Sequence, residues 1–479
     1  MIDEALMNGS ETVFAVKGFV IGNSNPEHFY FTNVCTDSRE VVKNTLFVPL
    51  VGEFQNGHKY ISQGIEKGAS VVLLNKDEYD GNKEFYDNLA NNNETLFIAV
   101  KNTMKALQDA AEFYVEKFPS LEKIAITGSC GKTTTKELLV SIFSQKYNVV
   151  ATKGNFNSET GLPLSVFQIR KEHQVGIFEM GMNRVNEIEE IVRVLKPKYA
   201  IITNIGTAHI GILGSRANIA TEKRKIFSFI PENGAAFIPS EDDFKSFISE
   251  GVKGKIIEYG KSISSEVSGV QFVKDDGMFG CDFKYQNENI HLNLSGTHNY
   301  VNALGAIAIA KEFEISAKEI KKGVEQLKSL NGRMEIDCIA LDGKKINFIK
   351  DFYNANLDSM VKSIQFLKNL EVEGNKFVVL ADMKELGPES KKMHESVGNE
   401  ISNSMLDYCI LVGPEMKAAY KIVNGNKSIK SFYFEDNSNE AFEKIIELLR
   451  KNSCSGDTVL LKGSHSMSLE KTITLIEKI

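Results

Sequence analysis

The sequence predicts an α/β fold divided among three domains. A chain of 479 residues exceeds the usual size of one domain and suggests roughly three. Strand and helix patterns alternate regularly through the middle of the chain and again after Asn331-Gly332. Such βαβ alternation predicts parallel sheets that bind ligands at the carboxyl ends of their strands. We therefore divide the chain into residues 1–105, 106–330 and 331–479.

The first region mixes short apolar strands with one helical stretch. The strand candidates are LFVPLVG, SVVLLN and LFIAV, and the helical one is YISQGIEKGA. Thr103 is a good N-cap residue for the segment TMKALQDAAEFYVEKF, which has helical spacing and then meets Pro119. We place the first domain boundary at this helix.

The other two regions alternate more clearly. In the middle region we expect strands at IAIT, VVAT, VGIFEM and AIITNIG, with helices at KELLVSIFSQ, near LPLSVFQI, at EIEEIVRVL and through EKRKIFSFI. A β-ribbon is expected over residues 266–295, followed by the helices HNYVNALGAIAIAKEF and AKEIKKGVEQL. In the third region the strands KFVVLAD, YCILVG, SFYFED and DTVLLKG, separated by helices, predict another doubly wound sheet.

The stretch IAITGSCGKTTT indicates a phosphate-binding loop. Lys123–Thr127 is a short β-run, Gly128–Gly131 a tight loop, and a helix follows from Thr133. Loop amides and the helix N-terminus would then converge on one anionic group. We expect Lys132 to reach the terminal phosphates and the Thr133 hydroxyl to bind Mg²⁺. Ile126 stands where the pattern GxxxxGK[ST] has its first glycine.

Two further side chains are candidates for metal binding, and a lysine and a cysteine near them have simpler interpretations. Glu179 and His209 come at the ends of successive strands, beside the expected loop, where an ATP-bound metal would need ligands. Taken alone, each is more often a satisfied structural group. Lys223 lies in the charge cluster TEKRKIF, and such a cluster is usually a solvated helix face. Cys130, inside the loop, is interpreted as a passive spacer.

Composition limits the classes of partner. The formal net charge of −7 argues against a nucleic-acid or membrane-surface binder and favours small substrates. The six scattered cysteines form no CxxC pair and read as reduced thiols. The acidic start MIDEALMNGS has no signal pattern, and no apolar run reaches the ~18 residues of a spanning helix. We expect a cytoplasmic monomer without nucleic-acid partners or membrane insertion.

These segments together resemble the Mur ligases over nearly the whole chain. TDSR and LFVPLVGEFQNGHKYI are similar to the N-terminal UDP-binding domain of that family, and TGSCGKTTTKELL to its phosphate loop, which has one internal glycine. GNFNSETGLPLS, EMGMN, TNIGTAHIGILGS, IATEKRKIF and GTHNYVNALGAIAIA follow in the family's order. DFYNANLDSM, ADMKELGPESKKMHESVG and LLKGSHSMSLEK look most like the members that add D-alanyl-D-alanine.

The resemblance implies a fold and an activity. The expected architecture is a central parallel-sheet ATPase domain between an N-terminal α/β UDP-binding domain and a C-terminal Rossmann-like domain. The expected reaction joins D-alanyl-D-alanine to UDP-N-acetylmuramoyl-tripeptide through an acyl phosphate. The product would be the UDP-linked pentapeptide precursor of peptidoglycan, needed for cell shape and division. ATP, two Mg²⁺ ions and CO₂ or bicarbonate for lysine carbamylation are the implied cofactors.

The resemblance to the Mur ligases also implies roles for individual residues. Catalytic roles would fall to Lys132, Glu179, His209 and Lys223, and Mg²⁺ would be bound by Thr133, Glu179, His209 and carbamylated Lys223. ATP would contact Thr127, Gly128, Ser129, Cys130, Gly131, Lys132, Thr133, Thr134, Asn299, Asn302, Arg333 and Asp351. The substrates would contact Ser38, Arg39, Asn155, Asn157, Ser158, Tyr353, Asn354 and Asn356.

The sequence also departs from the family pattern. The departures are Lys350 for a usual Asp, Leu357 for Pro, Ser158 for Asn, Ala381 for Gly and His465 for Arg, and Asn183–Asn186 where His-Pro-Gly is more usual. Ser158 and His465 fall in segments expected to face the substrates. A related ligase that joins another amine to another carboxylate therefore stays open, as does an ATP-driven regulatory protein. The third residue of the tripeptide and the second of the dipeptide also stay open.

Overall fold

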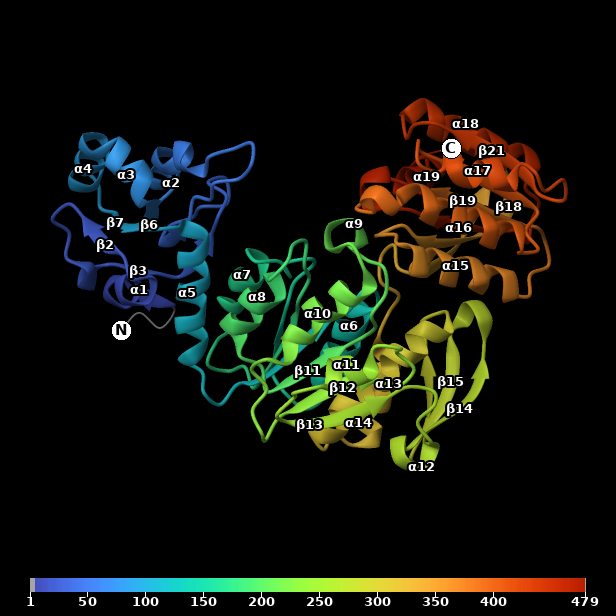
Figure 1. Ribbon diagram of the computed structural model, residues 1–479, viewed down its shortest axis with the longest axis horizontal. Helices are drawn as coiled ribbons and strands as arrows, with labels where there is room; N and C mark the ends of the chain where they lie inside the picture. Colours follow the sequence, from blue (N-terminus) through green and yellow to red (C-terminus); the bar gives the residue numbers. More distant parts are fainter. Residues whose placement is uncertain (1–4, 479) are drawn as a thin grey trace.

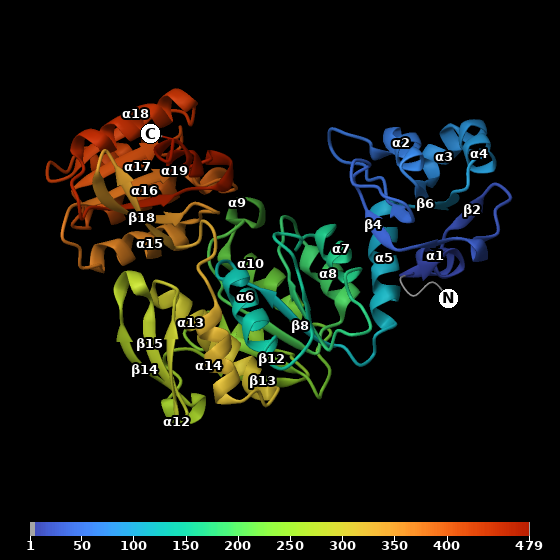
Figure 2. The same ribbon diagram turned by 180° about the vertical axis from the view of Figure 1, so that it is seen from behind.

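The computed structural model describes residues 5–478. Three α/β units follow one another, with the N-terminal unit (blue) and the C-terminal unit (orange to red) on opposite sides of the central one (Figure 1). The view from behind shows the same order (Figure 2). This confirms the predicted α/β fold class. Among the described residues, no helix combines the length and apolar character that crossing a membrane requires.

The N-terminal unit is built on a five-stranded sheet. The strands of the whole unit are β1 (Met7–Asn8), β2 (Phe19–Ile21), β3 (Tyr30–Phe31), β4 (Asn33–Cys35), β5 (Thr45–Phe47), β6 (Ala69–Asn75) and β7 (Leu96–Val100). Its helices are α1 (Gly9–Val16), α2 (Ile61–Glu66), α3 (Lys76–Gly81), α4 (Lys83–Asn91) and α5 (Thr103–Glu116). The sheet order is β2-β7-β6-β5-β4, with only β2 antiparallel to its neighbour, and β1 pairs with β3 apart from it.

Helix α5 leads from this unit into the central one. The prediction of Thr103 as its N-cap is wrong by one residue, because the Asn102 side chain caps the helix by accepting from the Lys105 amide at 2.9 Å. Thr103 instead donates its hydroxyl to the Pro49 carbonyl at 2.6 Å and its amide to Asn75 Oδ1 at 2.8 Å. Thr103 therefore ties the start of α5 to the N-terminal sheet.

The central unit contains a parallel sheet and a small ribbon. The sheet strands are β8 (Glu122–Thr127), β9 (Val149–Ala151), β10 (Val175–Glu179), β11 (Tyr199–Ile202), β12 (Ala235–Pro239) and β13 (Lys255–Tyr259). The antiparallel ribbon β14 (Val270–Asp275), β15 (Cys281–Tyr285) and β16 (Glu288–Leu292) lies where it was predicted. The helices are α6 (Lys132–Phe143), α7 (Gly161–Val166), α8 (Glu187–Leu195), α9 (Ile210–Leu213), α10 (Arg216–Arg224), α11 (Lys245–Ser249), α12 (Ser265–Ser268), α13 (Thr297–Glu312) and α14 (Ala317–Gln326).

Strand β8 occupies the middle of the central sheet. The order is β13-β12-β11-β8-β10-β9, and every pair is parallel. Ile124 and Ile126 pack toward α6, α13 and α14, while Ala125 faces the core formed with α7, α8 and α10. Because β10 and β11 flank β8, the loops after these three strands meet at one edge of the sheet, where open α/β sheets bind ligands.

The C-terminal unit is a second doubly wound sheet. Its strands are β17 (Glu335–Leu341), β18 (Lys344–Asp351), β19 (Lys376–Ala381), β20 (Tyr408–Val412), β21 (Lys430–Phe434) and β22 (Thr458–Lys462), in the order β17-β18-β22-β19-β20-β21. Helices α15 (Leu357–Asn369), α16 (Ser390–Ser402) and α17 (Lys417–Val423) pack on one face, and α18 (Asn439–Asn452) and α19 (Glu470–Ile476) on the other. The four predicted strands are confirmed, whereas the antiparallel pair β17–β18 was not predicted.

The C-terminal unit packs directly on the segment that follows β11 and includes α9. The Thr207 amide and hydroxyl both donate to Asp358 Oδ2, each at 2.6 Å. The Gly211 amide donates to the Glu385 carbonyl at 3.1 Å. A Cβ added to Gly211 would lie 2.4 Å from the Gly387 nitrogen and 2.5 Å from the Glu385 oxygen. Only glycine allows the two backbones to approach this closely.

Gly211→Ala is therefore expected to loosen the C-terminal unit. The added methyl group meets backbone atoms that cannot rotate away, so we expect a cost of about 1–3 kcal/mol at this contact. Small-angle scattering should give a larger radius of gyration than that of the wild type. Gly81→Ala is the matched control, because its methyl group would meet no heavy atom within 4 Å. Equal radii for the two variants would contradict the contact.

Candidate active site

A large cavity of about 1330 Å³ lies between the central and C-terminal units. Of the residues predicted to form the site, those on its wall are Ser129, Cys130, Gly131, Lys132, Thr133, Thr134, Asn155, Asn157, Ser158, Glu179, His209, Asn299, Asn302, Arg333, Asp351, Tyr353, Asn354 and Asn356. Five others, Thr127, Gly128, Lys223, Ser38 and Arg39, lie away from the wall. Residues from two units thus share one space.

The phosphate loop has the predicted strand–loop–helix form. Strand β8 ends at Thr127, and α6 begins at Lys132 directly after Gly131, which adopts φ 82°. The first-turn amides of α6 are therefore free to bind an anion. A Cβ added to Gly131 would lie 2.5 Å from Asn302 Oδ1. Asn204 stabilises the loop, because its Oδ1 accepts a hydrogen bond from the Cys130 amide at 2.9 Å.

Two lysines converge on the carbonyl of Gly128. Lys132 Nζ donates to this oxygen at 2.9 Å, and Lys223 Nζ donates to it at 3.0 Å. Lys223 is 1% exposed, so it does not belong to a solvated helix face. Burial, and then the nearby charge of Lys132, holds the pKa of the Lys223 amine well below its usual value. The Lys132 ammonium therefore supplies the positive charge suited to a phosphate, while Lys223 is held toward its neutral form beside it.

Glu179 is the buried carboxylate at this edge of the sheet. Its side chain accepts from the Thr133 hydroxyl at 2.9 Å and from Asn157 Nδ2 at 2.7 Å. Carboxylate and hydroxyl oxygens are the ligands that Mg²⁺ prefers. Within residues 5–478, no three His, Cys, Asp or Glu side chains are grouped closely enough to hold a metal by themselves. A metal here fits only if Thr133, a modified lysine or phosphate oxygens complete the site.

His209 is met by a carboxylate from the C-terminal unit. Its Nδ1 lies 2.7 Å from Glu385 Oε2, and this contact lowers the pKa of the Glu385 carboxyl. Both residues adopt φ 64°, in the left-handed region that is unusual for side chains other than glycine. Such conformations concentrate at functional sites. Sequence reasoning missed Glu385, although it lies in the quoted segment ADMKELG.

The C-terminal wall carries its own charged group. Asp351 Oδ2 accepts from the Ser363 hydroxyl at 2.7 Å and from the buried Lys462 ammonium at 2.6 Å. The Arg333 guanidinium lies 3.8 Å from the centre of the Tyr353 ring. Lys462 was not predicted from the sequence. It is the last residue of β22, whose end meets the cavity only after the third unit has folded.

His298 is a third cavity residue that sequence reasoning missed. It lies near the start of α13, beside Asn299, and lines the cavity. Burial lowers the pKa of its imidazole to about 4. The ring is therefore neutral near pH 7 and can both donate and accept a hydrogen bond. The segment HNYVN, quoted for its two asparagines, contained this signal.

The predicted UDP-contacting residues lie in the N-terminal unit, apart from the cavity. The Ser38 hydroxyl donates to Gln63 Oε1 at 2.7 Å. The exposed Arg39 side chain pairs with Asp37 at 2.6 Å. Among the predicted ATP-contacting residues, Thr127 is fully buried and donates its hydroxyl to the Met180 carbonyl at 2.8 Å.

Two of the residues that depart from the family pattern, Lys350 and His465, have partners within the C-terminal unit. The Lys350 ammonium contacts Glu335 at 3.1 Å and also Asp337, so its charge is compensated within the sheet. His465 stacks on Tyr353 with ring centres 5.9 Å apart. Through Tyr353 and Arg333, His465 is coupled to the cavity although it does not line it.

Comparison with known proteins identifies the family. Residues 126–310 match the Mur ligase middle domain, and residues 332–465 match the domain described as Mur ligase, glutamate ligase domain. A relative from Treponema pallidum is 40% identical over 477 residues, which make up 99% of each chain. The chain belongs to the Mur ligase family. That relative bears the name UDP-N-acetylmuramoyl-tripeptide–D-alanyl-D-alanine ligase.

Solved structures of Mur ligases agree with this assignment. MurF from Acinetobacter baumannii superposes with a TM-score of 0.86 at 29% identity, covering 98% of this Mur ligase and 99% of that chain. MurF from Thermotoga maritima, solved in complex with ADP, has a TM-score of 0.75 at 25% identity and coverages of 93% and 97%. The resemblance and the three-domain architecture predicted from the sequence are thereby confirmed.

Proposed function

We propose that this Mur ligase joins D-alanyl-D-alanine to UDP-N-acetylmuramoyl-tripeptide at the expense of ATP. The correspondence with the Treponema pallidum relative of that name, over 99% of both chains, carries the proposal. The product would be the UDP-linked pentapeptide used to build peptidoglycan. All six cysteines are free thiols, which fits a reducing cytoplasm. We also propose that the enzyme works as a monomer.

ATP would bind with its phosphates on the loop between β8 and α6. The amides from Gly131 to Thr134 and the Lys132 ammonium supply the positive end of the site, whereas the Ser129 and Cys130 amides donate to Asn204. Asn299 and Asn302 would contact the adenine, and Arg333 and Asp351 would hold the nucleotide from the C-terminal side. That the Thermotoga maritima relative was solved in complex with ADP supports nucleotide binding by this Mur ligase.

Thr133, Glu179, His209 and a carbamylated Lys223 would hold two Mg²⁺ ions. When bound, these ions supply electrostatic stabilisation to the phosphoryl oxygens. Unmodified, the Lys223 amine shares one carbonyl with the Lys132 ammonium. Burial, and then the charge of Lys132, holds the pKa of this amine well below its usual value. Its lowered pKa favours the neutral amine, which is the form that reacts with CO₂. Carbamylation would turn this amine into an oxygen anion suited to a hard metal.

The reaction would proceed in two steps, phosphorylation of the carboxylate and then formation of the amide. A terminal carboxylate oxygen of the tripeptide attacks the γ-phosphorus of ATP, the bond to the β-phosphate oxygen breaks, and ADP leaves. The amine of D-alanyl-D-alanine then attacks the acyl carbon, loses a proton and expels phosphate. Lys132 would stabilise the charge on the transferring phosphoryl group. Asn155, Asn157 and Ser158 would face one substrate from the central unit, and Tyr353, Asn354 and Asn356 from the C-terminal unit.

Binding of the UDP-linked substrate should draw the N-terminal unit toward the cavity. We keep residues 1–105, 106–330 and 331–479 as the proposed domains, with Ser38 and Arg39 on the UDP moiety. Both residues lie away from the cavity wall, so closure would assemble the site and exclude water from the acyl phosphate. Small-angle scattering with nucleotide and UDP-tripeptide should show a smaller radius of gyration. An unchanged radius would count against closure.

The function is tested by following phosphate release with ATP, Mg²⁺ and bicarbonate. Each candidate UDP-tripeptide is supplied with D-alanyl-D-alanine, and each component is omitted in turn. We expect release only when both substrates are present, and the active tripeptide identifies its third residue. Silence with every tripeptide, while ADP still binds, would favour a related ligase with a different amine or carboxylate. Ser158 and His465 would then be the first residues to exchange.

A further inference from the structure

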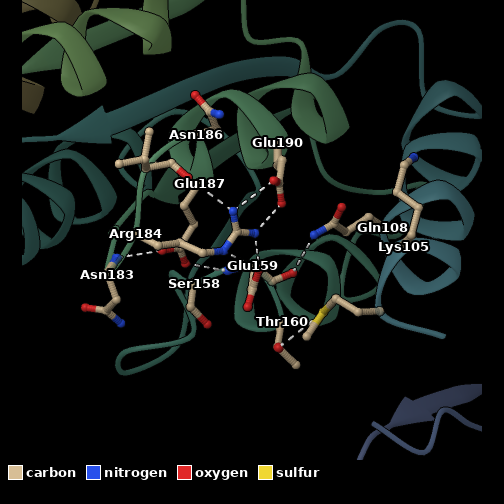
Figure 3. Close-up of polar contacts among 12 residues, drawn as sticks. Lys105, Gln108, Ser158, Glu159, Thr160, Asn183, Arg184, Asn186, Glu187 and Glu190 are labelled. Atoms are coloured by element: carbon tan, nitrogen blue, oxygen red, sulfur yellow. Dashed lines mark hydrogen bonds and ion pairs between the residues drawn. The ribbon is translucent and has the colours of Figure 1, made fainter. Parts of the chain in front are cut away.

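The loops after β9 and β10 together form one wall of the cavity. Asn157 and Ser158 belong to the first loop, and Met182 and Asn183 to the second. The second loop continues into Asn183–Asn186, where the sequence departs from the family pattern. Directly behind the wall, the Arg184 side chain points between two carboxylates (Figure 3).

The guanidinium of Arg184 bridges a loop and a helix. Its Nε donates to Glu159 Oε2 at 3.1 Å, and one terminal nitrogen contacts the same oxygen. Its two terminal nitrogens donate to the two oxygens of Glu190 on α8, at 2.9 and 2.5 Å. These bonds lower the pKa of the Glu190 carboxyl. The planar fork of arginine makes this paired geometry, which a lysine ammonium cannot reproduce.

The buried carboxylate of Glu187 joins the same two loops through their backbones. It accepts from the Glu159 amide at 3.0 Å and from the Asn183 amide at 2.5 Å. Gln108 of α5 adds a longer bond, from its Nε2 to the Glu159 carbonyl at 3.4 Å. Figure 3 shows Arg184, Glu187 and Gln108 surrounding Glu159. Glu159 is thus held through its amide, its carbonyl and its side chain.

This clamp is connected to the reacting end of the cavity. Two residues before Glu159, the Asn157 carbonyl accepts from the Gly181 amide at 2.8 Å, and Asn157 Nδ2 donates to Glu179 at 2.7 Å. A Cβ added to Gly181 would lie 2.9 Å from Asn157 Oδ1, so the two loops fit closely. Glu179 in turn bonds Thr133 of the phosphate loop. A shift of Glu159 would therefore move Asn157 relative to the phosphate site.

We propose that Arg184 is a positioning residue for the substrate that carries the reacting carboxylate. By clamping Glu159 to Glu190, it fixes the wall formed by Asn157 and Ser158 against the phosphate loop. The inference rests on the proposed function, because it assigns this wall to the carboxylate substrate. The side chains of Arg184, Glu159 and Glu190 are 42%, 30% and 37% exposed. Pairs this exposed contribute little to stability, so the clamp acts on loop position more than on folding.

The test compares Arg184→Ala with Arg193→Ala. Arg193 also lies next to α5, pairing with Glu112 and with Asp109 at 3.3 Å, but it does not line the cavity. Because small displacements of substrate-positioning groups can cost up to 10²-fold, we expect Arg184→Ala to raise KM for the UDP-tripeptide roughly 10- to 100-fold. KM for ATP, ADP affinity by calorimetry and Tm should match those of Arg193→Ala. Arg184→Lys should have a KM for the UDP-tripeptide between those of the wild type and Arg184→Ala.

The outcomes separate the inference from the proposed function. Equal KM values for the UDP-tripeptide in the two alanine variants would overturn the role of Arg184. So would a parallel loss of ADP affinity in Arg184→Ala, since the clamp would then act on the whole unit. If Arg184→Ala does not fold, the KM of Arg184→Lys for the UDP-tripeptide is compared with that of Arg193→Ala instead. A wild-type protein that binds ADP yet forms no product would overturn the proposed function, and this inference with it.

Discussion

Lys223→Ala is expected to reduce product formation by about 10²–10³-fold, the size of effect seen when a group that stabilises transition-state charge is removed. The Lys223 amine is buried against the phosphate loop, 3.0 Å from the Gly128 carbonyl. Alanine cannot form a carbamate, so it would remove the proposed oxygen ligand close to the transferring phosphoryl group. Turnover is measured by phosphate release with saturating substrates, and ADP affinity by calorimetry should change far less.

The neighbouring cation provides the control for this prediction. Arg224 follows Lys223 on α10, but its guanidinium lies 4.6 Å from the centre of the Phe247 ring, away from the loop. Arg224→Ala should therefore keep most of the activity. Removing bicarbonate and CO₂ should lower wild-type turnover, and adding bicarbonate should restore it. Full activity of Lys223→Ala, or indifference to bicarbonate, would show that the carbamate has no role.

Lys132→Ala is expected to lower kcat by a similar factor, about 10²-fold or more, through loss of charge on the γ-phosphoryl group. Unlike Lys223, Lys132 lines the cavity and lies at the first position of α6. Its loss should therefore also weaken binding of ATP and ADP, which calorimetry measures directly. This weakening distinguishes the two lysine variants.

Lys146→Ala is the control for the loss of a lysine near α6. Lys146 is exposed and lies beyond the C-terminal end of α6, whereas the phosphate loop lies at the N-terminal end. Its ammonium donates to the Glu314 carbonyl at 3.1 Å. We expect wild-type kinetics from it. If Lys132→Ala bound ADP as tightly as Lys146→Ala and turned over at the same rate, the phosphate site would be misplaced.

The sequence predicted those features that depend on neighbours along the chain. The strand, the glycine loop and the start of α6 follow one another within IAITGSCGKTTT, so local pattern sufficed. The ribbon β14–β16 was found for the same reason. The hairpin β17–β18 was missed although its turn, Asp342-Gly343, has the residues that a tight hairpin favours. Both residues have positive φ, 51° and 76°, and alternating apolar residues flank them.

Features that depend on tertiary contacts could not be predicted from residue patterns. Lys223 stands in a charge cluster, and only the packing of α10 against the phosphate loop makes it a buried amine. Glu385 and Lys462 come from the third unit and reach the site only when that unit docks. Asn102 and not Thr103 is the N-cap of α5, because Thr103 donates hydrogen bonds to Pro49 and Asn75 of the N-terminal unit. In each case a partner distant in sequence determines the role.

The central claim is that ATP activates the carboxylate that becomes the new amide. The most direct test supplies UDP-tripeptide with ¹⁸O in both oxygens of its terminal carboxylate, together with ATP and D-alanyl-D-alanine, and analyses the products by mass spectrometry. We predict one ¹⁸O atom in the released phosphate and one in the new amide of the UDP-pentapeptide. Phosphate without ¹⁸O, or phosphate release without pentapeptide, would contradict the claim.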